Sequence, residues 1–252
     1  MTANRPARPA GIEPAAVGSA TPGIYDPPLP FSGGRIPASA REYRHAQWRV
    51  MSLCFVAPAL SLAAVSLGAS LGWPWLAALG ALALGLTGVA YGGLAAVERR
   101  LMFIRGPTLL GRREHRYRYF IYDGVAAVPY GLAFAIAGAA LAGAALLFLL
   151  GTSLGQMRAA VLAQPHLALV PAGGALLAHG LGFLIGFSRT PASPGDRFSI
   201  ALQHLPARLG ALILIGWALA LLAVGLVEWL RPDVFDAGFR SVFGNPWPFA
   251  RR

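Results

Sequence analysis

The sequence contains no lysine and a single cysteine, and it has few charged side chains of any kind. Asp, Glu, Lys and Arg make up 12% of its 252 residues and hydrophobic residues 56%, whereas a soluble domain usually carries about 25% charged residues. This deficit, together with long uncharged blocks, predicts a membrane protein. With only Cys54 an intrachain disulfide is excluded, and a cysteine-built metal site is not expected. Cys54 lies in an apolar block and is interpreted as a small buried hydrophobe.

Several short motifs that carry catalytic chemistry are also missing. No Gly-rich phosphate loop ends in lysine, and HExxH and CxxC do not occur. The apolar blocks hold no Asp, Glu or Arg between their ends, although ion- and proton-coupled transporters usually carry such groups at mid-membrane. The sequence therefore argues against coupled transport and ranks an intramembrane enzyme third among the possible functions. No stretch is specific enough to indicate a family.

The positive charge that is present is arginine, and its densest run is the loop at 98–123, between two apolar blocks. Each arginine at mid-membrane costs roughly 2.5–3.5 kcal/mol, so this loop is expected to stay on the cytoplasmic side. It is predicted to contact anionic lipid headgroups or a cytoplasmic partner. The net charge of +11 is assigned to topology and lipid contact, because no basic-aromatic domain for nucleic acid exists outside the apolar blocks. The arginines of this loop are Arg99, Arg100, Arg105, Arg112, Arg113, Arg116 and Arg118.

Five apolar blocks are long enough to cross a bilayer, which needs about 20 residues. The fold class predicted is an all-α membrane protein, a bundle of about five transmembrane helices (four to six), with a disordered Pro-rich arm at 1–38. The helical domain, 39–230, opens on a capping box of Ser39 and Glu42. The tail at 231–252 is predicted to hold an interfacial amphipathic helix beginning near Asp233. The predicted spans are 50–71, 74–97, 124–151, 167–187 and 207–230.

Local details and orientation follow from the same residues. Pro58 is expected to kink the first span, Asp123 to cap the third, and Glu228 to pair with Arg231. Basic flanks at the N-terminus and at 98–123 place the N-terminus in the cytoplasm and the C-terminus outside. The predicted location is a bacterial-type inner membrane.

Small residues recur at helix-packing spacing. Glycines four apart let helix backbones approach closely, and in lipid apolar side chains alone drive little association. Such faces could pack within the chain or against another subunit, and glycine raised by a GC-rich genome without any interface is the alternative. The packing glycines predicted are Gly68, Gly72, Gly88, Gly92, Gly138, Gly182 and Gly186.

His179 is the one strongly titratable residue deep inside a predicted span. An intramembrane histidine could ligate a haem or a chlorophyll-like pigment, or move a proton. It could equally be a neutral histidine bonded to a neighbouring helix, and that interpretation is preferred. No other cofactor and no metal are predicted.

Two functions remain in view. The leading hypothesis is a non-catalytic inner-membrane accessory or scaffold subunit that packs partner helices, or a second copy, against its small-residue faces. The alternative is an uncoupled small-molecule transporter or channel component with a polar path near His179, Tyr91 and Tyr130.

Overall fold

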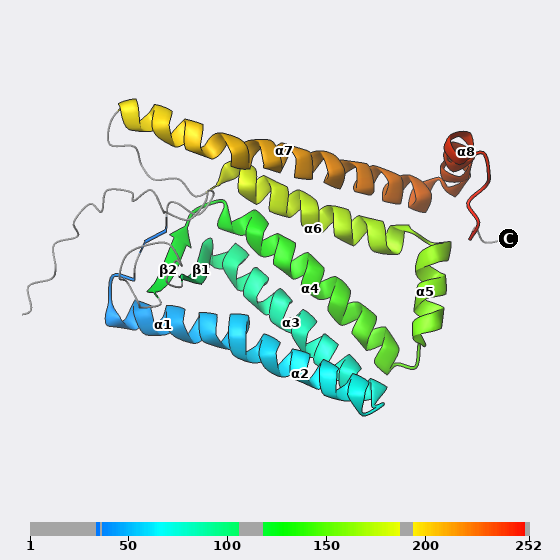
Figure 1. Ribbon diagram of the computed structural model, residues 1–252, viewed down its shortest axis with the longest axis horizontal. Coiled ribbons are helices and arrows are strands. Elements are labelled where there is room, and N and C mark those ends of the chain that lie inside the picture. Colours follow the sequence, from blue (N-terminus) through cyan, green and yellow to red (C-terminus); the bar gives the residue numbers. More distant parts are fainter. Residues whose placement is uncertain (1–33, 36, 106–117, 187–193, 250–252) are drawn as a thin grey trace, which may run out of the picture.

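The structure, a computed structural model, describes residues 34–35, 37–105, 118–186 and 194–249. Most of the predicted arm at 1–38 lies outside the described residues, as do Arg112, Arg113 and Arg116. The described chain is mostly helical (Figure 1). Its elements are α1 (Ala40–Val50), a π-helical turn (Met51–Val56), α2 (Ala57–Ser70), α3 (Pro74–Glu98), β1 (Arg100–Arg105), β2 (Arg118–Asp123), α4 (Ala127–Leu149), α5 (Leu154–Ala163), α6 (His166–Ile185), α7 (Pro194–Leu230) and α8 (Pro232–Phe243).

Among the described residues, five helices are long and apolar enough to cross a membrane, which confirms the predicted number of such helices. They are Ala40–Ser70, Pro74–Glu98, Ala127–Leu149, His166–Ile185 and Leu205–Leu230. The prediction of an all-α fold is wrong in one place, because β1 and β2 form an antiparallel hairpin between α3 and α4. Its register runs from Arg100 opposite Asp123 to Arg105 opposite Arg118. Aromatic and β-branched residues favour this extended pairing.

The first long helix runs from α1 through the π-helical turn into α2. Ser39 caps it as predicted, since its hydroxyl accepts the Glu42 N–H at 3.1 Å. The Glu42 carboxylate, however, accepts from the Ala38 N–H at 2.7 Å. The π-helical turn ends two residues before Pro58. Proline has no N–H to donate to the carbonyl four residues earlier, and a wider turn is a common way to accommodate that loss.

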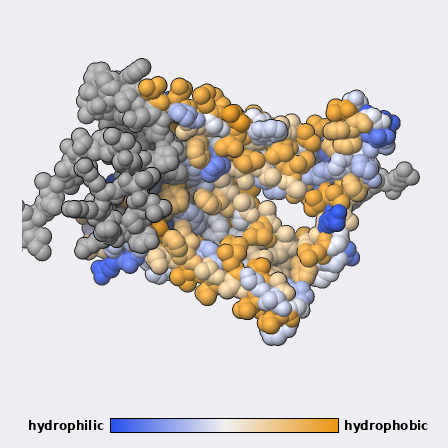
Figure 2. Space-filling view, in the orientation of Figure 1, coloured by the Kyte–Doolittle hydropathy of each residue, from blue (hydrophilic) through white to orange (hydrophobic). Residues whose placement is uncertain are grey.

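The long helices stand in a row. In the order α2, α3, α4, α6, α7, each packs on its neighbours, and the described residues show no extensive packing between helices that are not adjacent in this order. Figure 1, viewed down the shortest axis, shows them side by side. The broad face of the row that is seen in Figure 2 is largely apolar. Leu60 is 67% and Trp217 66% exposed, values that would be costly in water and are ordinary in lipid.

The α3–α4 contact is made by backbone against backbone. A Cβ added at Gly92 would lie under 3.0 Å from the Gly131 carbonyl oxygen, and one added at Gly138 equally close to the Gly85 carbonyl oxygen. Gly88 faces Gly138 at a slightly longer distance. Helices that approach this closely gain dispersion contacts along their whole length, which is the main attraction available in an apolar solvent.

The row opens at one end. Helices α4 and α6 lie close together near the hairpin and diverge away from it, and α5 crosses between their far ends (Figure 1). The tail that follows α8 is joined to α5 by a hydrogen bond from the Trp247 indole N–H to the Leu162 carbonyl at 2.9 Å. We call the two ends of the row the hairpin end and the distal end, the distal end carrying α5 and α8.

Adjacent glycines on α3 give a matched pair of variants. Gly92→Ala is expected to lower the free energy of unfolding by about 1–3 kcal/mol, because its methyl meets backbone that cannot move aside. Gly93→Ala is expected not to destabilise, since a Cβ there meets nothing within 4 Å and alanine favours a helix. Reversible unfolding in mixed micelles, followed by circular dichroism, measures both. Equal effects of the two variants would contradict the backbone contact.

Candidate functional site

A buried ion pair ties the first two long helices together at the hairpin end. Arg49 is 4% exposed, and its guanidinium donates to both carboxylate oxygens of Glu98, each at 2.7 Å. The two residues meet because the first long helix, which opens with α1, begins at the end of the row where its antiparallel neighbour α3 ends. A two-pronged arginine–carboxylate contact fixes geometry as well as charge. It satisfies a cation that burial would otherwise make costly.

The hairpin closes over this ion pair. Leu101, Met102 and Ile121 are at most 2% exposed, so both strands press apolar side chains onto the ends of the helices. The Tyr91 hydroxyl donates to the Met102 carbonyl at 2.9 Å, which ties α3 to β1. The hairpin is thus a packed cap on the row of helices.

Arg35 links the chain before α1 to the hairpin. Its backbone N–H and carbonyl both pair with Ile121 at 2.9 Å. Its guanidinium donates to Glu42 at 2.6 and 2.9 Å and to Asp123 at 2.6 Å. These carboxylates, Glu42 first, raise the pKa of Arg35 above its ordinary value. Asp123 also pairs with Arg100 at 2.9 Å, so it does not cap α4 as predicted; the residue preceding that helix is Ala126.

The predicted arginine surface is only partly described. Arg99 ends α3 in a left-handed conformation with φ 52°, and it is exposed. Arg100 pairs with Asp123. Arg105 and Arg118 are opposite each other in the strand register. Contact of these arginines with lipid or a partner remains a prediction.

His179 lies in an aromatic cluster between α4 and α6. Its ring meets the Tyr130 ring edge-on at 5.4 Å and the Phe183 ring at 4.8 Å. Tyr91 instead contacts Phe134 at 5.5 Å and the hairpin's Phe103 at 6.3 Å. Within the described ranges, no group of three or more His, Cys, Asp or Glu side chains could hold a metal ion. This packing favours the interpretation of His179 as a structural histidine.

The predicted packing glycines occupy different settings. Gly68 meets the α3 backbone at Ala77, and Gly182 meets the face of Tyr130. Gly72 and Gly186 lie at helix ends with φ of 67° and 64°, a backbone conformation that glycine adopts readily. A Cβ at Gly72 would meet nothing within 4 Å. Its place in the structure is therefore a turn.

A carboxylate and a histidine meet at the distal end. One oxygen of Glu228, near the end of α7, accepts the His166 backbone N–H at 3.0 Å and lies 2.5 Å from the ring Nδ1. His166 is the first residue of α6, so the negative charge lies at a helix N-terminus, where it is favoured. The prediction that Glu228 pairs with Arg231 is wrong, because Arg231 pairs with Asp233 at 3.1 Å.

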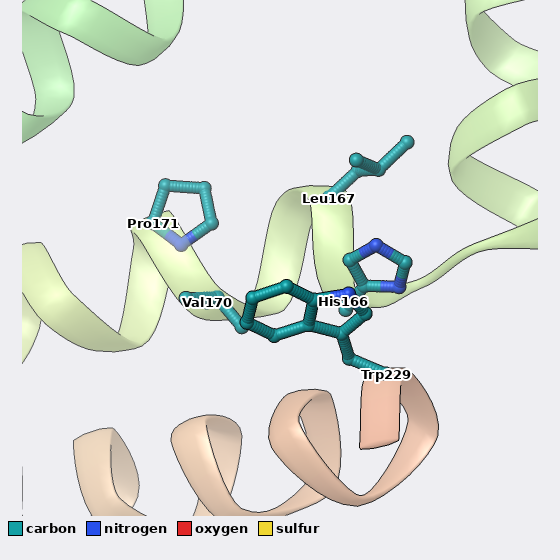
Figure 3. Close-up of a pocket in the computed structure, with 5 residues that line it drawn as sticks. All are labelled: His166, Leu167, Val170, Pro171 and Trp229. Carbon is teal, nitrogen blue, oxygen red and sulfur yellow. The ribbon is translucent and has the colours of Figure 1, made fainter. Parts of the chain in front are cut away.

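Figure 3 shows the pocket beside this pair. His166 stacks on Trp229 with ring centroids 5.8 Å apart, while Leu167 and Pro171 extend from α6 on the side away from Trp229. Val170 completes a shallow, mainly apolar pocket of about 330 Å³. A histidine oriented by a carboxylate can donate or accept one further hydrogen bond through Nε2, and no nucleophilic side chain lines the pocket with it.

Sequence reasoning missed both of these pairs, although a signal was present. Arg49 directly precedes the first apolar block and Glu98 ends the second, so antiparallel packing brings them to one end. The same holds for His166 before the fourth block and Glu228 at the end of the fifth. Polar side chains that can pair, and that stand at same-side ends of consecutive blocks, could therefore have been paired before the structure was known.

The fold is a row of long apolar helices with a polar side-chain pair at each end, Arg49–Glu98 at the hairpin end and His166–Glu228 at the distal end. Comparison with protein-family models, with curated proteins and with solved structures finds no match to the chain. Its function therefore has to be argued from its own geometry.

Loss of the buried pair's carboxylate gives a direct test of its contribution. Glu98→Ala should lower the free energy of unfolding by about 3 kcal/mol, because it leaves the Arg49 guanidinium buried and unpaired. Arg49→Met combined with Glu98→Gln should recover most of that loss. Asp233→Ala, which removes an exposed pair, should have no measurable effect. Thermal unfolding in detergent compares these three variants with the wild-type protein. A loss of stability in Glu98→Ala no larger than that in Asp233→Ala would contradict the buried ion pair.

Proposed function

We propose that this chain is a non-catalytic, membrane-spanning scaffold or accessory subunit that receives a partner's transmembrane helix between α4 and α6. The observation that carries the proposal is the open row of helices. Each long helix has neighbours on one or two sides only. The remaining apolar surface is available to lipid or to helices of another protein (Figure 2).

The opening between α4 and α6 suits a helix because one of its walls is made of small residues. Ile136 lies 3.7 Å from the position that a Cβ on Gly174 would occupy, which is where α4 still touches α6. Ala140 and Gly143 continue that face of α4 at helical spacing. A Cβ at Gly143 would meet nothing within 4 Å. Two small residues on one face of a helix, here Ala140 and Gly143, allow the backbone of another helix to approach closely.

The opposite wall is apolar and comes from α6. Leu167 is 47% exposed and, with Pro171, extends away from α7 (Figure 3). Between α4 and α6 the surface is hollowed (Figure 2). The α4–α6 opening, defined by Ala140, Gly143, Leu167 and Pro171, thus offers one smooth wall and one wall of larger apolar groups.

The alternative, an uncoupled transporter or channel component, finds less support. Such a protein needs helices arranged around a polar or hollow axis, and a single row provides no enclosed axis. Tyr130 and His179 pack against each other, and the two pockets characterised in the described part of the chain lie at the distal end. A substrate flux in liposomes that depends on His179 would favour this alternative over the scaffold.

The proposal is tested by a bulky residue placed in the opening. Wild-type protein, purified in mild detergent, is expected to carry a membrane-protein partner or a second copy at near-stoichiometric amounts. Gly143→Leu is expected to reduce that partner at least tenfold without changing the thermal midpoint, because a Cβ at Gly143 meets nothing within 4 Å among the described residues. Mass spectrometry of the purified material measures the ratio.

Gly216→Leu on α7 is the matched control. A Cβ there also meets nothing within 4 Å, but its neighbours Ile213 and Trp217 are large and more than 60% exposed, as on a lipid-facing surface. This variant should retain the partner. Wild-type protein that purifies alone, or Gly143→Leu protein that keeps its partner, would contradict the proposed function.

A further inference from the structure

Helix α5 carries a cation that has no counter-charge among the described residues. Arg158 is exposed, and within the part of the chain that the structure describes it takes part in no hydrogen bond or ion pair. At the same end, each described carboxylate already has a partner. Glu228 binds His166, Asp233 binds Arg231, and Asp236 binds both Arg240 and the Trp247 N–H.

The surroundings of Arg158 are apolar on both sides. Gly155, Ala159 and Leu162 lie on the same face of α5, at spacings of three and four residues, and together with Phe249 of the tail they line a pocket of about 400 Å³ with Arg158. On the other side of Arg158, at 100° per residue, follow Leu154 and Val161. These two side chains are 69% and 38% exposed.

The pocket is built by two segments that are held together. The Trp247 indole donates to the Leu162 carbonyl at 2.9 Å, and Phe249 packs on the Trp247 ring with centroids 5.7 Å apart. Helix α5 crosses the row at its distal end (Figure 1). In a membrane-spanning protein that is the level of the lipid headgroups, where an amphipathic helix lies along the surface.

We infer that Arg158 and the apolar pocket between α5 and the tail bind one anionic phospholipid, with the phosphate at the guanidinium and an acyl chain along Leu162 and Phe249. The charge supports an anion, since the described carboxylates of this end are all engaged. The apolar residues on both sides support an amphiphile over a free phosphate. An arginine near such a surface stabilises an anionic lipid through charge as well as hydrogen bonds. This site is separate from the α4–α6 opening and does not depend on the proposed partner helix.

The test places a photoreactive residue inside the pocket. Full-length protein with Phe249→p-benzoylphenylalanine is reconstituted into nanodiscs that contain equal amounts of phosphatidylglycerol and phosphatidylcholine with the same acyl chains. Irradiation is expected to give mainly the phosphatidylglycerol adduct, identified by mass. Arg158→Gln should lower that adduct about fivefold, whereas Arg158→Lys should retain most of it.

Arg240→Gln, which removes one positive charge from the same end, is the control and should leave the adduct unchanged. Equal adducts of the two lipids in the unmodified background, or no effect of Arg158→Gln, would overturn the inference. So would an adduct to a peptide in place of lipid, or complete competition by millimolar soluble glycerol phosphate, which would point to a free phosphate ligand.

Discussion

Guanidinium groups enter hydrocarbon only at a cost of roughly 2.5–3.5 kcal/mol each, and the arrangement of this chain follows that constraint. Its arginines stand at the ends of the apolar blocks, and the structure gives several of them carboxylate partners there. Arg35 and Arg100 share Asp123, and Arg49 binds Glu98. Between the ends, the helices carry almost no polar side chains, so packing there relies on shape. The result is a row of apolar helices whose ends are joined by polar side-chain pairs.

Few large side chains are buried between the helices of the row, so close backbone contact at glycines contributes much of the packing. Where α3 meets α4, Gly92 faces Gly131 and Gly85 faces Gly138, so backbone dispersion replaces the interdigitating side chains of a soluble core. On α4 beyond its contact with Gly174, α4 and α6 separate, and a Cβ at Gly143 would meet nothing within 4 Å. We propose that this difference between close contact and separation is what makes the chain a scaffold.

The sequence predicted the elements better than their contacts. Hydropathy located five long apolar helices, and the helix beginning after Ser39 followed from local residue chemistry. The pairing of Arg100–Arg105 with Arg118–Asp123 was not predicted, because both segments are short and their pairing depends on packing over α1 and α3. Pairs such as Arg49–Glu98 and His166–Glu228 join residues 49 and 62 positions apart. The spacing of three residues on one helix predicted Arg231 as the partner of Glu228, whereas its partner in the structure is His166.

An odd number of membrane crossings would put the N-terminal side of α1, at the hairpin end, and helix α8, at the distal end, on opposite sides of the membrane. Single cysteines in a Cys54→Ala background measure this directly, with Arg44→Cys at the hairpin end and Ser241→Cys on α8, both exposed in the structure. A membrane-impermeant maleimide should label Ser241→Cys in intact cells and Arg44→Cys only after permeabilisation. Equal labelling or equal protection of the two positions in intact cells would contradict the five-helix membrane topology.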